Sequence, residues 1–127
     1  MALEELQENA MMSHLVRALE RGQDIGHYGR LVFVMVGQHF LSDDEVIALL
    51  TKDADCDERK ARAIVAQVKS HGYNPPKPER ILQWMKEQEF PICEAADGDT
   101  EGCNVYKSLK FPPEVYERIA NYYRGHG

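Results

Sequence analysis

The stretch HYGRLVFVMVGQHF, residues 27–40, joins two polar side chains to the most apolar run in the sequence. Behind His27 and Arg30 come six consecutive apolar residues, Leu31 to Val36. A run of this kind has no face suited to water, so we expect it to cross the middle of the core. It fits either a buried helix or a central strand, and the neighbouring segments decide between them.

Those neighbours have helical patterns. Apolar residues recur at three- and four-residue spacing over residues 3–19, which predicts one amphipathic helix ending at Gly22. Residues 42–45, Ser-Asp-Asp-Glu, fit a capping box that opens another helix, and Asp57 is a typical N-cap for the next. This succession favours a helix for residues 27–40 as well.

The second half begins with stop signals. Gly72 and the Pro75-Pro76 pair end the preceding helix, Pro78 suits the first position of a short one, and Pro112-Pro113 opens a last one. Residues 90–110 have no periodicity, and loops of that length are usually functional, ligand-stabilised or disordered. We therefore expect an all-α protein: one domain, residues 1–127, folded as a compact bundle of about six helices with a long irregular loop at 90–110 between the last two.

Composition excludes several classes of protein. The net charge of −6 argues against indiscriminate nucleic-acid binding, although the basic residues concentrate in the first two thirds of the chain. No apolar window spans a bilayer, and Glu4 and Glu5 do not fit a signal peptide, so a cytoplasmic protein without membrane association is expected. Phosphate loops, nucleophile elbows, HExxH motifs and paired Asp motifs are missing from the sequence, which predicts no enzyme and no catalytic residues.

Two of the three cysteines, Cys93 and Cys103, lie in the long loop, ten residues apart. An odd count in a reducing compartment favours thiols or metal ligands over a disulfide. Zinc and iron–sulfur clusters need about four ligands, so we expect two reduced thiols and no cofactor. Cys93 and Cys103 remain the only candidate metal ligands. They could complete a metal site between two protomers, each of which would contribute both cysteines.

His27 and Arg30 are three residues apart, so they project from one face near a helix N-terminus, where backbone N–H groups and the dipole favour an anion. This is a candidate phosphate site. Arg17 and Arg21, at the end of the preceding helix, can converge on it across a short turn. The alternative is that all are solvated helix-end charges and that His27 only caps its helix.

A second basic group, Arg59, Lys60 and Arg62, lies near the start of the helix that Asp57 opens. It can contact phosphate or an acidic partner, or it can be a solvated face paired with Glu58 and Asp57. Aromatic rings that can stack nucleobases are equally well explained as core residues: Tyr73, Trp84, Tyr106, Tyr116, Tyr122 and Tyr123.

The order of these features resembles the C-terminal helical domain of the archaeal and eukaryotic DNA primase large subunit. The resemblance covers roughly Leu15 to Pro76 and extends more loosely to Tyr123. It rests on a leader helix ending at Gly22 and on three motifs in family order: His27-x-x-Arg30, Asp57-x-x-Lys60-x-Arg62 and Tyr73-x-Pro75-Pro76.

The same family usually carries a four-cysteine iron–sulfur cluster. Its first two cysteines would fall near Met11 and Pro78 here, so only Cys93 and Cys103 remain. The resemblance thus implies a relative that has lost the cluster. Family-typical aromatic and His positions on the fourth helix are also replaced, by Ala63 and Gln67.

In that family the domain forms no phosphodiester bonds, but holds the initiating nucleotide or the primer's 5′ triphosphate, with template, for a catalytic subunit. The resemblance therefore implies a non-catalytic, primase-associated module similar to an accessory archaeal primase subunit. His27 and Arg30 would be its phosphate ligands, supported by Arg62. Its partners would be a catalytic primase subunit or other replication protein and DNA or RNA primer–template. The alternative is a protein–protein adaptor that binds no nucleic acid.

Overall fold

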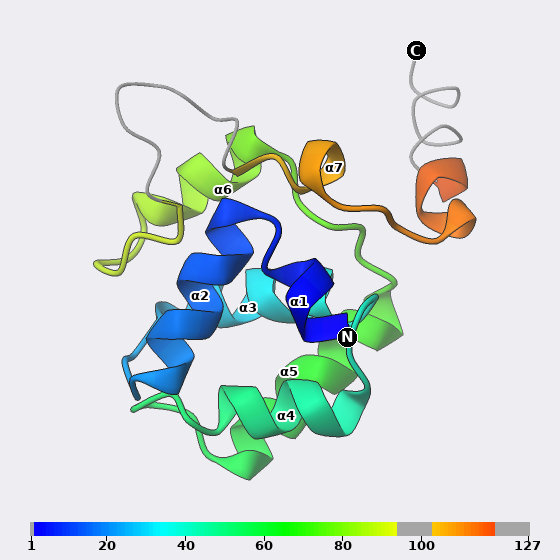
Figure 1. The fold of residues 1–127 in the computed structure, drawn as a ribbon. Coiled ribbons are helices and arrows are strands. Elements are labelled where there is room, and N and C mark those ends of the chain that lie inside the picture. Colours follow the sequence, from blue (N-terminus) through cyan, green and yellow to red (C-terminus); the bar gives the residue numbers. More distant parts are fainter. Residues whose placement is uncertain (1, 94–102, 119–127) are drawn as a thin grey trace.

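The computed structural model describes residues 2–93 and 103–118 of the chain (Figure 1). Every regular element in these ranges is a helix, which confirms the all-α prediction. The helices are α1 (Ala2–Leu6), α2 (Ala10–Glu20), α3 (Gly26–Gly37), α4 (Asp43–Leu50), α5 (Glu58–His71), α6 (Pro78–Met85) and α7 (Val105–Ser108), and residues 113–118 are also helical. None of the described helices combines the length and apolarity needed to cross a membrane.

The apolar run forms α3, the central helix, and not a strand. Its residues from 29 to 37 are all buried, and it packs against α2, α4, α5 and α6. Figure 1 shows α3 in the middle of the molecule, between the α4–α5 pair and α6. The helix ends at Gly37, three residues before the predicted end at Phe40, because a turn follows in which the Phe40 N–H donates to the Gly37 carbonyl at 3.0 Å.

At the N-terminus the prediction of one helix over residues 3–19 is wrong, because the helix is interrupted between Leu6 and Ala10. Buried Asn9 starts α2 afresh, since its side-chain oxygen accepts from the Met12 N–H at 3.0 Å. Asparagine is a strong N-cap because its side chain satisfies an otherwise unpaired backbone donor. The apolar spacing continues across the break because α1 and α2 bury side chains in the same core.

The other predicted helix boundaries are confirmed. Ser42 and Glu45 exchange both hydrogen bonds of a capping box, at 3.2 and 3.0 Å. The Asp57 carboxylate accepts from the Lys60 N–H at 2.8 Å, and Gly72 ends α5 with a φ of +61°. Pro78 stands at the start of α6. These boundaries are set by the residues at the helix ends themselves, which is why the sequence predicts them.

A buried ion pair joins the start of α3 to the connection between α4 and α5. Arg30 is 3% exposed, and its Nη1 donates to the Asp53 carboxylate at 3.1 Å. The Asp53 side chain is fully buried and also accepts from the backbone N–H groups of Ile25 at 2.9 Å and Asp55 at 2.7 Å. Asp53 therefore holds two chain segments and one guanidinium together.

Cys93 and Cys103 form a disulfide, so the expectation of two reduced thiols is wrong. Both cysteines are buried, and their Cα atoms lie 5.8 Å apart, within the usual range for a disulfide. The expectation came from the odd cysteine count and the assumed reducing compartment, and neither indicates which cysteines lie close together in the fold. The third cysteine, Cys56, is buried and unpaired. Residues 94–102 of the predicted 90–110 loop lie outside the described residues, and α7 lies within the rest of it.

We predict that Asp53→Ala lowers the free energy of unfolding by about 3–5 kcal/mol, because it leaves the Arg30 charge buried without its main partner. The matched control is Asp55→Ala. Asp55 also faces Arg30, at 3.8 Å, but its side chain is 65% exposed, so its loss should cost at most about 1 kcal/mol. Urea unfolding of both variants measures the difference. Equal losses of free energy of unfolding would contradict the conclusion that Asp53 is the main partner of Arg30.

We also predict that His39 makes stability depend on pH. Its ring lies 5.5 Å from Phe111, and burial, aided by the charge of Arg118, lowers its pKa below 6.5 against the opposing charge of Glu114. The unfolded state thus binds the proton more readily, and the free energy of unfolding falls as pH drops below 6.5. Urea unfolding between pH 5 and 8 should show a smaller decrease in His39→Gln than in the wild type. Parallel curves would refute this assignment.

Candidate functional site

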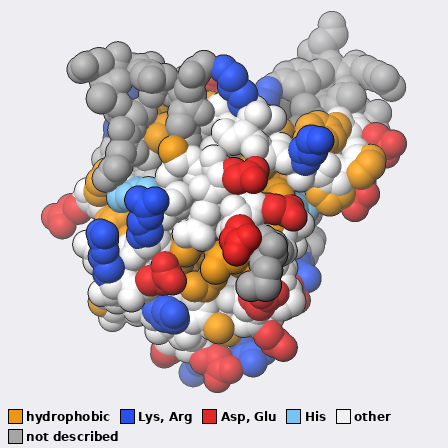
Figure 2. Space-filling view, in the orientation of Figure 1, with side chains coloured by type: hydrophobic (Ala, Val, Ile, Leu, Met, Phe, Trp, Pro, Cys, Tyr) orange, Lys and Arg blue, Asp and Glu red, His pale blue; other side chains and the backbone are white. Residues whose placement is uncertain are grey.

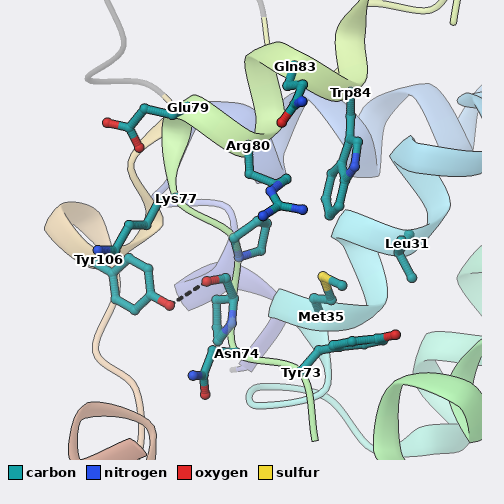
Figure 3. Close-up of a pocket in the computed structure, with 12 residues that line it drawn as sticks. Leu31, Met35, Tyr73, Asn74, Lys77, Glu79, Arg80, Gln83, Trp84 and Tyr106 are labelled. Carbon is teal, nitrogen blue, oxygen red and sulfur yellow. Dashed lines mark hydrogen bonds between the residues drawn. The ribbon is translucent and has the colours of Figure 1, made fainter. Parts of the chain in front are cut away.

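A groove of about 730 Å³ lies between α3, α6, α7 and the proline-containing segment before α6 (Figure 3). Leu31 and Met35 of α3 are among its apolar lining residues. Three part-buried aromatic side chains also line it: Tyr73, Trp84 and Tyr106. Its remaining lining residues are the two prolines and the polar side chains Asn74, Lys77, Glu79, Arg80 and Gln83.

The proline pair gives the groove its shape. Pro75 and Pro76 are buried, and proline restricts both its own backbone and that of the residue before it, which favours an extended segment. The Tyr106 hydroxyl of α7 donates to the Pro75 carbonyl, the dashed contact in Figure 3. Burial raises the pKa of Tyr106 to about 12, so its hydroxyl keeps the proton that it donates. Two segments far apart in the sequence are thereby joined across the groove.

A row of rings connects the groove to the start of α3. Tyr28 stacks on Trp84 with ring centroids 5.4 Å apart, and His27 meets Tyr28 edge-on at 5.1 Å. The Arg80 guanidinium carbon lies 5.9 Å from the Trp84 ring centroid. In Figure 3 this guanidinium points into the groove beside the indole. Exposed His27 is therefore joined to the groove through two aromatic rings.

Arg30 has a structural environment. Besides Asp53, its Nη1 contacts the Asp24 carboxylate at 3.1 Å, and its Nη2 lies 3.8 Å from the Asp55 carboxylate. Three carboxylates thus surround a guanidinium that is almost fully buried. The sequence predicts Arg30 as a direct phosphate ligand, whereas in this structure its guanidinium pairs with acidic side chains of its own chain.

The protein's own side chains also occupy the start of α3, where an anion was expected. Asp24 accepts from the Gly26 N–H at 2.8 Å. Gln88, from the segment after α6, accepts from the Tyr28 N–H at 2.9 Å, while its amide nitrogen donates to the carbonyls of Ile25 and Phe90 at 2.9 and 3.0 Å. Side chains of the fold itself therefore accept from the backbone N–H groups of Ile25, Gly26 and Tyr28.

The remaining predicted residues occupy two other places. Arg17 and Arg21 line a separate groove of about 670 Å³ along α2, together with His14 and Phe90. Arg59 and Lys60 line a pocket at the start of α5. The seven predicted residues thus do not form one site.

The charges on α5 have acidic neighbours. Lys60 Nζ lies 3.0 Å from the Asp55 carbonyl and 3.3 Å from its carboxylate. Arg62 pairs with Glu58 at 2.9 Å, one helical turn away. The Arg62–Glu58 pair agrees with the alternative interpretation of this group as a face paired within the chain, whereas the Lys60 side chain pairs with Asp55 and not with Asp57.

No protein-family model, characterised protein or solved structure matches this chain. Over residues 2–93 and 103–118, no group of three or more His, Cys, Asp or Glu side chains is placed to hold a metal ion. The chemistry of the chain's own side chains is therefore the basis for proposing a function.

Sequence patterns did not indicate Arg80, Lys77 or Asn74 as site residues. A signal was present, because Arg80 precedes the single tryptophan, Trp84, by four residues on a helix that follows two prolines. That spacing places a cation and an aromatic ring on one helix face.

We predict that Gly26→Ala is more damaging than Gly22→Ala. Both glycines have positive φ, +80° and +73°, so alanine costs about 1–2 kcal/mol of strain at either. A Cβ on Gly26 would also lie 2.5 Å from the Gln88 amide, whereas one on Gly22 meets only the Lys52 carbonyl at 3.6 Å. Urea unfolding should show an excess loss of about 1 kcal/mol or more at Gly26.

Double variants test whether the contact with Gln88 causes the excess loss of stability in Gly26→Ala. In a Gln88→Ala background the excess cost of Gly26→Ala over Gly22→Ala should largely disappear. If the excess persists in that background, the contact between Gly26 and Gln88 does not explain it.

Proposed function

We propose that this chain is a non-catalytic, primase-associated module that binds an initiating nucleotide or the 5′ end of a primer in the groove between α3, α6 and α7. The single observation that carries the proposal is the side-chain content of the groove. Trp84, Tyr73 and Tyr106 stand beside Arg80 and Lys77 on one concave surface.

Each part of the groove has a matching part in a nucleotide. Part-buried aromatic side chains can stack a base, a contact worth about 1–3 kcal/mol. The Arg80 guanidinium can donate two hydrogen bonds to a phosphate, and the Lys77 ammonium adds a second charge. A volume of about 730 Å³ lies within the usual range for small-molecule sites.

The charge distribution favours a local site over a broad nucleic-acid surface. The chain carries a net charge of −6, and on the face in Figure 2 Lys and Arg side chains are interspersed with Asp and Glu. Such a surface attracts phosphate only where cations are concentrated. Among the described groove residues, Lys77 and Arg80 outnumber the one carboxylate, Glu79.

The resemblance to the primase large subunit supports the same assignment. Its Tyr73-x-Pro75-Pro76 motif supplies lining residues of the groove, and His27 of its first motif is joined to Trp84 through Tyr28. In this proposal Arg30 positions α3 and contacts no phosphate. In this proposal a catalytic primase partner performs the phosphodiester chemistry, since metal-assisted phosphoryl transfer uses paired carboxylates and the described lining of the groove contains one, Glu79.

Fluorescence of the single tryptophan tests the proposal directly, because Trp84 lies in the groove. We predict that a short RNA with a 5′ triphosphate quenches it, and that the same RNA with a 5′ hydroxyl binds more weakly. Arg80→Ala should weaken binding by about tenfold or more, through loss of charge-assisted hydrogen bonds. Raised salt should reduce the difference between the two RNAs.

The matched control is Lys69→Ala, which removes one positive charge from α5, where Lys69 pairs with Asp43 at 2.7 Å. It should leave the affinity unchanged. Equal affinity of the wild type and Arg80→Ala would overturn the groove assignment. Absence of any RNA or DNA binding, together with a stable protein partner in a pull-down, would decide for the adaptor function instead.

A further inference from the structure

Helix α7 forms one wall of the groove but is too short to be stable alone. It has four residues, Val105–Ser108, and brings Tyr106 to the Pro75 carbonyl. Isolated helices of this length do not persist in water, because nucleation fixes several residues for each hydrogen bond gained. The position of Tyr106 therefore depends on what anchors the chain on either side of α7.

The downstream anchor is a cluster of aromatic rings. Phe111 packs 5.6 Å from Phe40 and 5.5 Å from His39, measured between ring centroids. Tyr106 itself lies 5.4 Å from Phe111, and Leu109 between them is buried. The chain after α7 is thus held by non-covalent ring contacts against the turn that follows α3.

The upstream anchor is the Cys93–Cys103 disulfide. Cys103 stands two residues before α7, and Cys93 follows the segment that leaves α6. Both cysteines are buried next to the fully buried residues Ile92 and Val105. One covalent bond therefore fixes the N-terminal side of the groove wall to the chain that carries Trp84.

We propose that this disulfide is a redox clasp on the groove, so that its reduction loosens α7, withdraws Tyr106 and weakens ligand binding. The first part concerns the order of α7 alone, and the second rests on the proposed function. A dithiol supplies two electrons and two protons, the sulfur–sulfur bond becomes two thiols, and the dithiol becomes a disulfide. Because both sulfurs are buried, exchange needs local opening and is expected to take minutes to hours.

Hydrogen exchange of the ligand-free protein tests the first part. After complete reduction with dithiothreitol, amides of residues 104–108 should exchange about tenfold faster or more. The change should fall off toward Phe111, whose aromatic anchor is intact, and be absent from α4 and α5. Unchanged exchange at residues 104–108 would overturn the clasp.

Three variants make this test independent of the reductant. Cys93→Ser and Cys103→Ser should each reproduce the reduced pattern with or without dithiothreitol. Cys56→Ser removes the unpaired buried cysteine and should keep the full response of the wild type. If Cys56→Ser abolished the response, the effect would belong to Cys56 and the clasp would be wrong.

Binding of the 5′-triphosphate RNA tests the second part. Reduction should weaken it by about tenfold, the loss expected for one stacking partner. Tyr106→Ala should bind as weakly when oxidised as the wild type does when reduced, and should not respond to reduction. Faster exchange with no RNA binding in either redox state would keep the clasp and overturn the proposed function. If reduction changed neither the affinity for RNA nor the hydrogen exchange of residues 104–108, the proposed function would stand and the clasp would be overturned.

Discussion

The buried pair of Arg30 and Asp53 is the constraint on which the arrangement of this helical protein depends. Two charges removed from water must satisfy each other and their remaining hydrogen-bonding groups, or the fold loses several kcal/mol. Asp53 does so by also binding the backbone N–H groups of Ile25 and Asp55. The start of α3 is thereby fixed against the α4–α5 connection. Because Leu31 and Met35 of the same helix line the groove, this pair also helps to position the groove.

The groove itself is assembled from segments that are distant in sequence. Helix α3 and the proline pair contribute one side, α6 contributes Trp84 and Arg80, and α7 closes the groove with Tyr106. Gln88 adds a further link, since it ties the segment after α6 to the first turn of α3. The shape of this groove depends on several elements together, and contacts with Tyr28 and Phe111 outside the groove help to position Trp84 and Tyr106.

The sequence predicts what is local and misses what is long-range. The capping box at Ser42 and the N-cap at Asp57 use partners three residues away, so their pattern is visible in the chain. Spacing also places His27 and Arg30 correctly at one helix start. It gives no indication that Asp53, 23 residues on, neutralises Arg30, or that Gln88 fills the expected anion site. The groove was not predicted for the same reason, since Tyr73, Trp84 and Tyr106 come together only through tertiary packing.

We propose that ligand binds between α3, α6 and α7, and not at the buried Arg30. The most direct measurement is a two-dimensional ¹⁵N NMR titration of the oxidised protein with a short 5′-triphosphate RNA. We expect the largest shifts at the Trp84 indole N–H and at the backbone amides of Tyr73 and Tyr106, with little change at Arg59 and its neighbours at the start of α5. Large shifts at the start of α5 or along α2, with a silent Trp84 indole, would contradict it.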